Sequence, residues 1–299
     1  MREPDNLISR RDFIRGTACA TLALAMGIGV EGQEEVEAVK TTRVVLVRDK
    51  NVFDGKGQIS AEVIQRMLDD AVVALFEAKD PVEPWKQLLK PADVVGIKSN
   101  VWGPLPTPGE LEHALKQRVL DAGVAEKNIS IDDRGVLKDK IFRTATALIN
   151  ARPLRTHHWS GVGGCLKNYI MFVPKPYDYH DDTCADLAAI WKLPIVKDKT
   201  KLNVLVMLRP LFHGVGRHHF DETYTWEYKG LLVGTDPVAV DAVGLHIFQA
   251  KRLAYFGEEK RMTPPPHHIA FADTRHHLGT SDLAKIDLVR LGWQEGILI

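Results

Sequence analysis

The segment DVVGIKSNVWGPLPTPGELEHALKQRVLDAGVAEKNISIDD, residues 93–133, decides the fold. Its two ends, 93–98 and 128–133, are short apolar runs typical of strands. Between them, residues 110–122 carry apolar side chains at helical spacing and stop at Gly123. A strand, a helix and a second strand in this order predict a right-handed crossover between parallel strands of one sheet.

The rest of the chain extends this pattern. Residues 60–78 form an amphipathic helix by their apolar spacing, with Ser60 as a candidate cap. Further elements are expected as strands at 43–48, 145–150, 202–208, 228–233 and 286–291, and as helices at 138–144, 185–191 and 238–251. We therefore predict one α/β domain over residues 39–299, with a parallel or mixed sheet flanked by helices.

The N-terminus carries an export pattern. SRRDFIR at 9–15 fits the twin-arginine motif, and the apolar run at 17–30 is too short to span a bilayer comfortably. A Val-x-Ala sequence ending at Ala38 is the expected cleavage point, with Gly32 as a second choice. We expect residues 1–38 to be a signal peptide read by the twin-arginine export machinery, with no permanent membrane span and a periplasmic mature chain. An uncleaved anchor or a chance arginine pair is the alternative.

Composition excludes several classes of protein. The 39 basic residues balance 39 acidic ones, so charge gives no case for a nucleic-acid partner. Three cysteines cannot hold an iron–sulfur cluster that needs four, so none is expected within this chain. Spacing alone does not say whether Cys165 and Cys184 pair. The sequence also lacks the glycine-rich motifs that bind dinucleotides or nucleoside triphosphates, and the Gly-x-Ser-x-Gly motif of serine hydrolases.

The clearest candidate site is ALINARPLRTHHWSGVGGCLKN, residues 147–168. A strand that opens into a glycine-rich turn is where open α/β sheets bind ligands. Lys167 follows the glycines, so its amine can approach an anion or carbonyl as a charge or, once desolvated, as a nucleophile. Consecutive side chains of an extended segment point in opposite directions, and we choose His158 over His157 as the one facing the site. The ligand-binding candidates here are Thr156, Ser160, Gly163, Gly164 and Asn168.

A second wall is expected from other segments. Lys98 and Asn100 end the strand at 93–98 and are ligand-binding candidates. Asp236 precedes a proline and is either the N-cap of the next helix or a ligand contact. Asp241 lies one turn into that apolar helix, where an acid needs a partner. We expect it to face the ligand or pair with a lysine, as the third catalytic candidate beside Lys167 and His158.

The loop histidines have two interpretations, and the first is a metal site. His213 and His218 flank glycines in a second loop and, with His158, are candidate ligands of a transition metal held by His and carboxylate groups. No spacing matches a known metal motif, so scattered loop histidines are the other interpretation.

Three stretches together resemble the domain-of-unknown-function family three-six-two: 94–100, 154–168 and 234–242. The resemblance implies an α/β domain, often accompanied by ferredoxin-type modules and by redox or metal-linked work. This chain departs from that pattern, because it has no cysteine-rich module and carries Arg209 near an expected acidic position. More remotely, a His, a glycine-rich turn and a Lys in that order are similar to the cofactor segment of nickel-pincer lactate racemases, in which the lysine carries the cofactor.

The function that these features indicate is a metal- or cofactor-assisted enzyme, exported, acting on a small anionic or carbonyl compound. The alternative is a periplasmic ligand-binding or redox-accessory protein without turnover. The sequence names neither the substrate nor the reaction.

Overall fold

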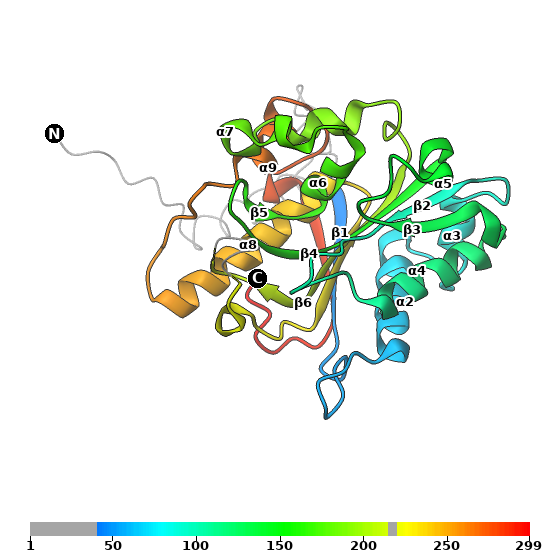
Figure 1. The fold of residues 1–299 in the computed structure, drawn as a ribbon. Coiled ribbons are helices and arrows are strands. Elements are labelled where there is room, and N and C mark those ends of the chain that lie inside the picture. Colours follow the sequence, from blue (N-terminus) through cyan, green and yellow to red (C-terminus); the bar gives the residue numbers. More distant parts are fainter. Residues whose placement is uncertain (1–40, 215–219) are drawn as a thin grey trace, which may run out of the picture. The chain divides into compact units, whose positions relative to one another are not determined.

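The computed structural model describes residues 41–214 and 220–299 (Figure 1). The expected signal peptide and His218 lie outside the described residues. The strands form one sheet in the order β3-β2-β4-β6-β7-β1-β8, with the short β5 paired to β4. Their bounds are β1 Thr42–Arg48, β2 Val95–Lys98, β3 Ile129–Asp132, β4 Ala147–His157, β5 Gly161–Gly163, β6 Thr200–Leu211, β7 Gly230–Gly234 and β8 Ile286–Gly292.

The sheet is mixed. Strands β3, β2, β4 and β6 pair in parallel, and β1 pairs in parallel with β8. Strand β7 runs antiparallel to both β6 and β1 and so lies between the two parallel groups. The carboxyl ends of β2, β3 and β4 therefore meet at one edge, where open α/β sheets bind ligands.

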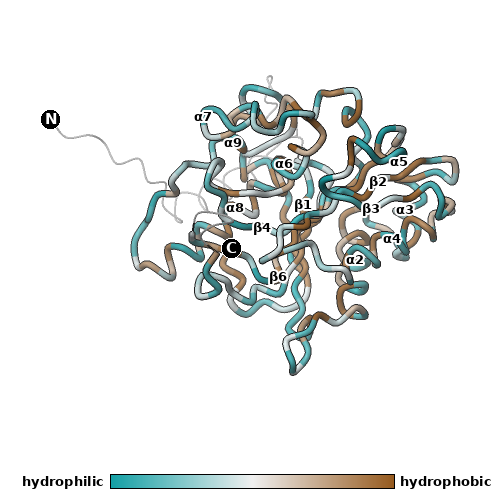
Figure 2. The backbone as a smooth tube through the Cα atoms, viewed as in Figure 1, coloured by the Kyte–Doolittle hydropathy of each residue, from teal (hydrophilic) through white to brown (hydrophobic). Residues whose placement is uncertain are grey.

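Helices cover both faces of the sheet (Figure 1). One core packs α2, α3 and α4 against the sheet, and the other packs α6, α8 and α9 against the opposite face. Figure 2 shows the apolar strands between these layers. The helix bounds are α2 Ala61–Phe76, α3 Glu83–Leu88, α4 Gly109–Asp121, α5 Lys140–Thr144, α6 Cys165–Asn168, α7 Asp181–Cys184, α8 Pro237–Phe256 and α9 His267–Thr274. These layers confirm the predicted α/β domain.

Local sequence explains the two long helices at the ends of the domain. Ser60 caps α2 by accepting the backbone N–H of Val63 at 3.3 Å, and the apolar positions of this helix are the buried ones. Asp236 caps α8 by accepting from Val238 and Ala239, with Pro237 at the first helical position. Within the described ranges, no helix is both long and apolar enough to cross a bilayer.

Three elements differ from the sequence expectations. Strand β4 continues to His157, well past the predicted end at Asn150, because its buried arginines interrupt the apolar run without ending the strand. Helix α9 is new, since we expected only a surface crossing around residues 264–268; it buries His268, Ile269 and Ala272. The predicted helix at 185–191 is a 3-10 helix over Leu187–Lys192.

Candidate functional site

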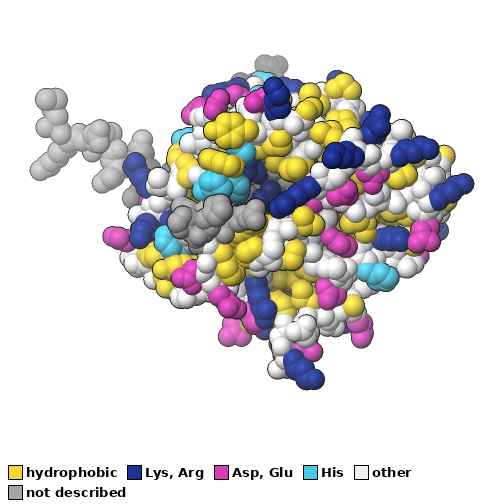
Figure 3. Space-filling model, viewed as in Figure 1, with side chains coloured by type: hydrophobic (Ala, Val, Ile, Leu, Met, Phe, Trp, Pro, Cys, Tyr) yellow, Lys and Arg dark blue, Asp and Glu magenta, His cyan; other side chains and the backbone are white. Residues whose placement is uncertain are grey.

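A pocket of about 260 Å³ lies beyond the carboxyl ends of β2, β3 and β4. On the face drawn in Figure 3, histidine and basic side chains gather around a hollow. Four basic side chains line the pocket: Arg134, Arg152, Arg155 and Lys167. The wall also includes the Asp133 carboxylate. Rings and amides complete it, among them Trp102, His157, Trp159, His180, Asn100 and Asn168. Of these residues, Lys167, Asn100 and Asn168 are site candidates predicted from the sequence.

Strand β4 supplies three of the lining side chains because its register shifts. Between Pro153 and Arg155 the pairing with β6 is irregular. In a regular strand, side chains three positions apart point to opposite faces. The irregularity changes this alternation, so Arg152 and Arg155 can both reach the pocket. His157 follows Arg155 on the same face, whereas Thr156 lines a different cavity with Gly161 and His213.

Three of the lining cations are buried. Arg152, Arg155 and Lys167 are 3%, 6% and 2% exposed. None of them lies within ion-pair distance of a carboxylate in the part of the chain that the structure describes, and the Nε atoms of both arginines lack a hydrogen-bond partner there. The Arg155 guanidinium lies over the Trp102 ring, 3.9 Å from its centroid. Because buried charges need compensation, this cluster is the most unusual electrostatic feature of the pocket.

Lys167 is held in an environment that favours its neutral form. Its Nζ contacts Cys184 Sγ at 3.6 Å. Burial, opposed by Cys184 and reinforced by the charges of Arg152 and Arg155, lowers the pKa of Lys167 to about 8. A fraction of the amine is therefore neutral near pH 7 and can act as a base or nucleophile toward a ligand in the pocket.

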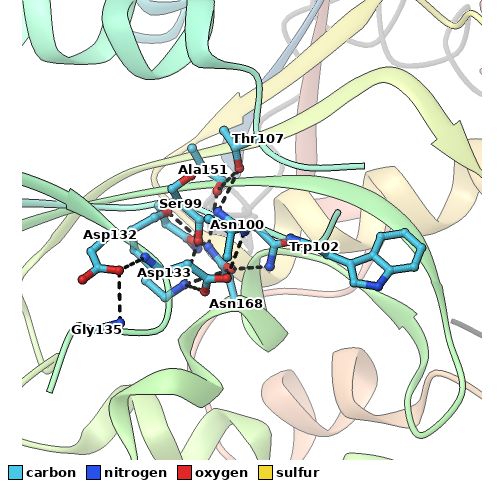
Figure 4. Close-up of polar contacts among 12 residues, drawn as sticks. Ser99, Asn100, Trp102, Thr107, Asp132, Asp133, Gly135, Ala151 and Asn168 are labelled. Carbon is cyan, nitrogen blue, oxygen red and sulfur yellow. Dashed lines mark hydrogen bonds and ion pairs between the residues drawn. The ribbon is translucent and has the colours of Figure 1, made fainter. Parts of the chain in front are cut away.

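A second buried lysine, Lys98, is hydrogen-bonded to Ser99, Asp133 and Asn168. Figure 4 shows these three partners close together. Lys98 Nζ donates to Asp133 Oδ1 at 2.5 Å, to the Ser99 carbonyl at 2.7 Å and to Asn168 Oδ1 at 3.3 Å. Asn168 in turn donates to Asn150 Oδ1 at 2.9 Å. Burial lowers the pKa of Lys98 to about 8, against the opposing effect of Asp133. This network fixes the Asn168 amide at the pocket wall.

Asp241 lies behind the turn that carries Lys167. Its carboxylate is completely buried and accepts the backbone N–H groups of Cys165 at 2.6 Å and Leu166 at 2.9 Å. Burial raises the pKa of Asp241 to about 6, although these two hydrogen bonds lower it. Asp241 thus positions the α6 turn. It lies close to the turn that carries Lys167 but forms no ion pair with the Lys167 amine.

The two glycines before the turn make room for side chains of the protein itself. A Cβ at Gly163 would collide with the Arg152 guanidinium, and one at Gly164 would collide with the Asp241 carboxylate. Both positions therefore allow a close approach of a charged group to the backbone.

Imidazoles and a tryptophan form the outer wall. His157 lines the pocket, and His158 stacks beside it with ring centroids 4.9 Å apart. Trp159 lies 4.0 Å from His158 and 3.9 Å from His180. Burial, with a contribution from Lys167, lowers the pKa of His157 well below its usual range and that of His180 to about 4. These two rings are therefore neutral at pH 7 and act as hydrogen-bonding groups.

The remaining candidates lie outside the pocket. Ser160 Oγ donates to the Val162 carbonyl at 2.7 Å. Asp236, besides capping α8, accepts the backbone N–H of Thr280 at 2.9 Å. His213 packs 4.7 Å from the Tyr224 ring. Among the described residues, no three His, Cys, Asp or Glu side chains form a group that could hold a metal ion, and Cys165 and Cys184 are free, buried thiols.

Sequence reasoning overlooked the arginines. Arg152 and Arg155 stand in an apolar context, and a charge within a buried strand is itself a signal that a partner is needed. It also overlooked His268 of α9, which is completely buried with neither ring nitrogen bonded within the described ranges. Burial, followed by the charge of Lys167, lowers the pKa of His268 to about 3.

Comparison with known proteins adds a family likeness. No curated protein and no solved structure matches the chain. Residues 116–246, which span β3, β4, the α6 turn and the first half of α8, match the model of the domain of unknown function DUF362, so this part of the chain resembles that family.

Proposed function

We propose that the chain is an enzyme that binds a small anionic or carbonyl compound in this pocket and acts on it through Lys167. The observation that supports it is the buried group Arg152, Arg155 and Lys167, which has no carboxylate partner among the described residues. Asp133 and Asp241 act on Arg152, and Asp133 on Arg155, without forming an ion pair. The buried cations are therefore only partly compensated, at a cost on the order of several kcal/mol for each ion, and an anionic ligand would supply further negative charge. Guanidinium groups suit carboxylates and phosphates in particular.

Each side chain has a role in this proposal. Arg152 and Arg155 bind the anionic group, and the amide of Asn168, which is bonded to Lys98, Asn150 and Ala151, fixes the pocket wall beside them. Lys167 is the base or nucleophile, and neutral His157, whose Nδ1 accepts the backbone N–H of Trp159, is a hydrogen-bond donor to the ligand. His158 supports the His157 ring by stacking, and Asp241 positions the turn.

Calorimetric titration of the full-length chain with pyruvate, lactate and phosphate tests the binding step. We expect Arg152→Gln and Arg155→Gln to weaken binding by about 10- to 100-fold, the equivalent of one charged hydrogen bond at about 1.5–3 kcal/mol. Arg143→Gln, on α5 and exposed, is the matched control and should bind as the wild type does. Equal affinity in all four proteins would contradict the proposal.

A binding or redox-accessory protein is the alternative, because the same cations would capture an anion without turnover. Following the bound compound by proton NMR separates the two functions. Conversion by the wild type that is lost in Lys167→Met supports an enzyme, and a compound that stays unchanged while bound supports the alternative.

Metal assistance and export are separate parts of the proposal. His158 stacks on His157, whereas His213 packs against Tyr224. Elemental analysis of the purified wild type and of His158→Ala tests whether the chain binds a metal through His158, His213 and His218. Twin-arginine export is tested by cell fractionation. Replacing Arg10 and Arg11 by lysine should retain the chain in the cytoplasm at full length.

A further inference from the structure

We infer that the ligand is a 2-oxo carboxylate, and that Lys167 Nζ condenses with its carbonyl carbon to form a Schiff base. This inference rests on the proposed function, since it assigns a substrate class to the same pocket. It follows from the difference between two buried lysines and from the position of two arginines.

Lys98 and Lys167 are equally inaccessible but differently bonded. Lys98 Nζ is surrounded by three oxygen acceptors, one of them the Asp133 carboxylate. Lys167 Nζ donates to the Cys184 thiol, and a thiol is a weak acceptor. A lysine that served only as a structural charge would be paired as Lys98 is. The amine of Lys167 is left for a ligand.

The surroundings of Lys167 also favour a reactive amine. Burial and the charges of Arg152 and Arg155 lower its pKa to about 8, so roughly a tenth of the amine is neutral at pH 7. Desolvation beside another cation is an established way to activate a lysine as a nucleophile.

The arginines define the other half of the ligand. Arg155 is oriented by the Trp102 ring, and the Nε atoms of Arg152 and Arg155 are unpartnered within the described ranges. Their planar donors match a carboxylate. All three cations line one cavity of about 260 Å³, near the lower limit of ligand pockets at roughly 300 Å³. A compound with its carbonyl directly beside its carboxylate can reach both kinds of group in so small a space.

The condensation balances without another reactant. The neutral Lys167 amine attacks the carbonyl carbon, a C–N bond forms, and the C=O π electrons move to oxygen, which takes a proton. The carbinolamine then loses a proton from nitrogen and its hydroxyl as water, leaving the imine. The oxygen takes the proton that the attacking nitrogen releases, relayed by solvent, so the condensation needs no net acid or base. No oxidant or reductant is consumed.

Borohydride trapping tests the inference. The full-length chain is incubated with pyruvate, reduced with sodium borohydride, and analysed by intact mass and peptide mapping. We expect one reduced adduct on Lys167. Lactate keeps the carboxylate but lacks the carbonyl and should give none, and acetone keeps the carbonyl but lacks the carboxylate and should label at least tenfold less. Lys167→Arg and Lys167→Met should give no adduct, with thermal unfolding confirming that each variant folds.

Calorimetry on the same samples distinguishes the possible failures. Pyruvate binding without an adduct would overturn the Schiff base and leave the anion pocket standing. Absence of both binding and adduct would overturn the inference together with the proposed function. Labelling that persists at other lysines in Lys167→Met, with none at Lys167 in the wild type, would also overturn it.

Discussion

Asp241 Oδ1 accepts the backbone N–H of Cys165 at 2.6 Å, so a helix that begins more than 70 residues later in the chain caps the turn carrying Lys167. The second carboxylate oxygen accepts from Leu166. The position of the Lys167 amine therefore depends on α8 as well as on the turn that carries it.

Removing this carboxylate should loosen the turn. Asp241→Ala leaves two buried N–H groups without an acceptor, at about 1–3 kcal/mol each, so we expect a loss of about 2–6 kcal/mol in the free energy of unfolding. Amide hydrogen exchange at Cys165 and Leu166 should become faster. Asp236→Ala removes the cap of α8 and should destabilise the protein without speeding exchange at those two amides. Equal exchange in the two variants would show that Asp241 does not hold the turn.

Lys167 should lower the stability of the fold. Its folded-state pKa of about 8 lies below the unfolded value of 10.5, so the charged amine is disfavoured in the folded state. That penalty is complete below pH 8 and disappears as the pH rises to about 10.5. Lys167→Met should therefore raise the free energy of unfolding by about 3 kcal/mol at pH 7, and the gain should vanish above pH 10.5.

Urea unfolding across this pH range measures the difference. Lys197→Met, at an exposed lysine, is the control and should change stability by less than about 0.5 kcal/mol. A gain in Lys167→Met that does not depend on pH would contradict the assigned environment.

Gly163 should be needed for ligand binding. Gly163→Ala places a Cβ against the Arg152 guanidinium, which must move away. We expect pyruvate affinity to fall about tenfold, as for the loss of one charged hydrogen bond of about 1.5 kcal/mol. Gly103→Ala, in a loop near the pocket, meets nothing within 4 Å and serves as the control. Calorimetry that gives the same affinity for both variants would disprove the role of Arg152.

Asp133 should be needed for stability because Lys98 depends on it. Asp133→Asn leaves the buried Lys98 amine without its counter-charge, and we expect a loss of about 3–5 kcal/mol in the free energy of unfolding. Combining it with Lys98→Met removes the uncompensated charge and should recover much of the loss. A double variant as unstable as the sum of the single ones would show that the two groups are not coupled.

Local patterns in the sequence were enough to predict most helices and strands of the fold. The apolar periodicity of α2 and the Asp-Pro start of α8 depend on neighbours along the chain, and both helices formed as predicted. The antiparallel direction of β7 depends on which strands pair with it, and no local pattern carries that information.

The site was only partly predictable for a similar reason. The glycine-rich turn and Lys167 stand out by residue type, and the turn does lie at the edge of the sheet. The direction of Arg152 and Arg155 depends on the irregular pairing after Pro153, which the sequence does not reveal. Asp241 was expected to need a partner, but backbone N–H groups satisfy a carboxylate as well as a lysine does.

Anomalous diffraction from bromide-soaked crystals of the full-length chain tests most directly whether Arg152, Arg155 and Lys167 together bind an anion. We predict a bromide ion in contact with both guanidinium groups and the Lys167 amine, which disappears when pyruvate is added to the soak. Bromide bound only at exposed basic side chains, with none in this pocket whether or not pyruvate is present, would contradict the central claim.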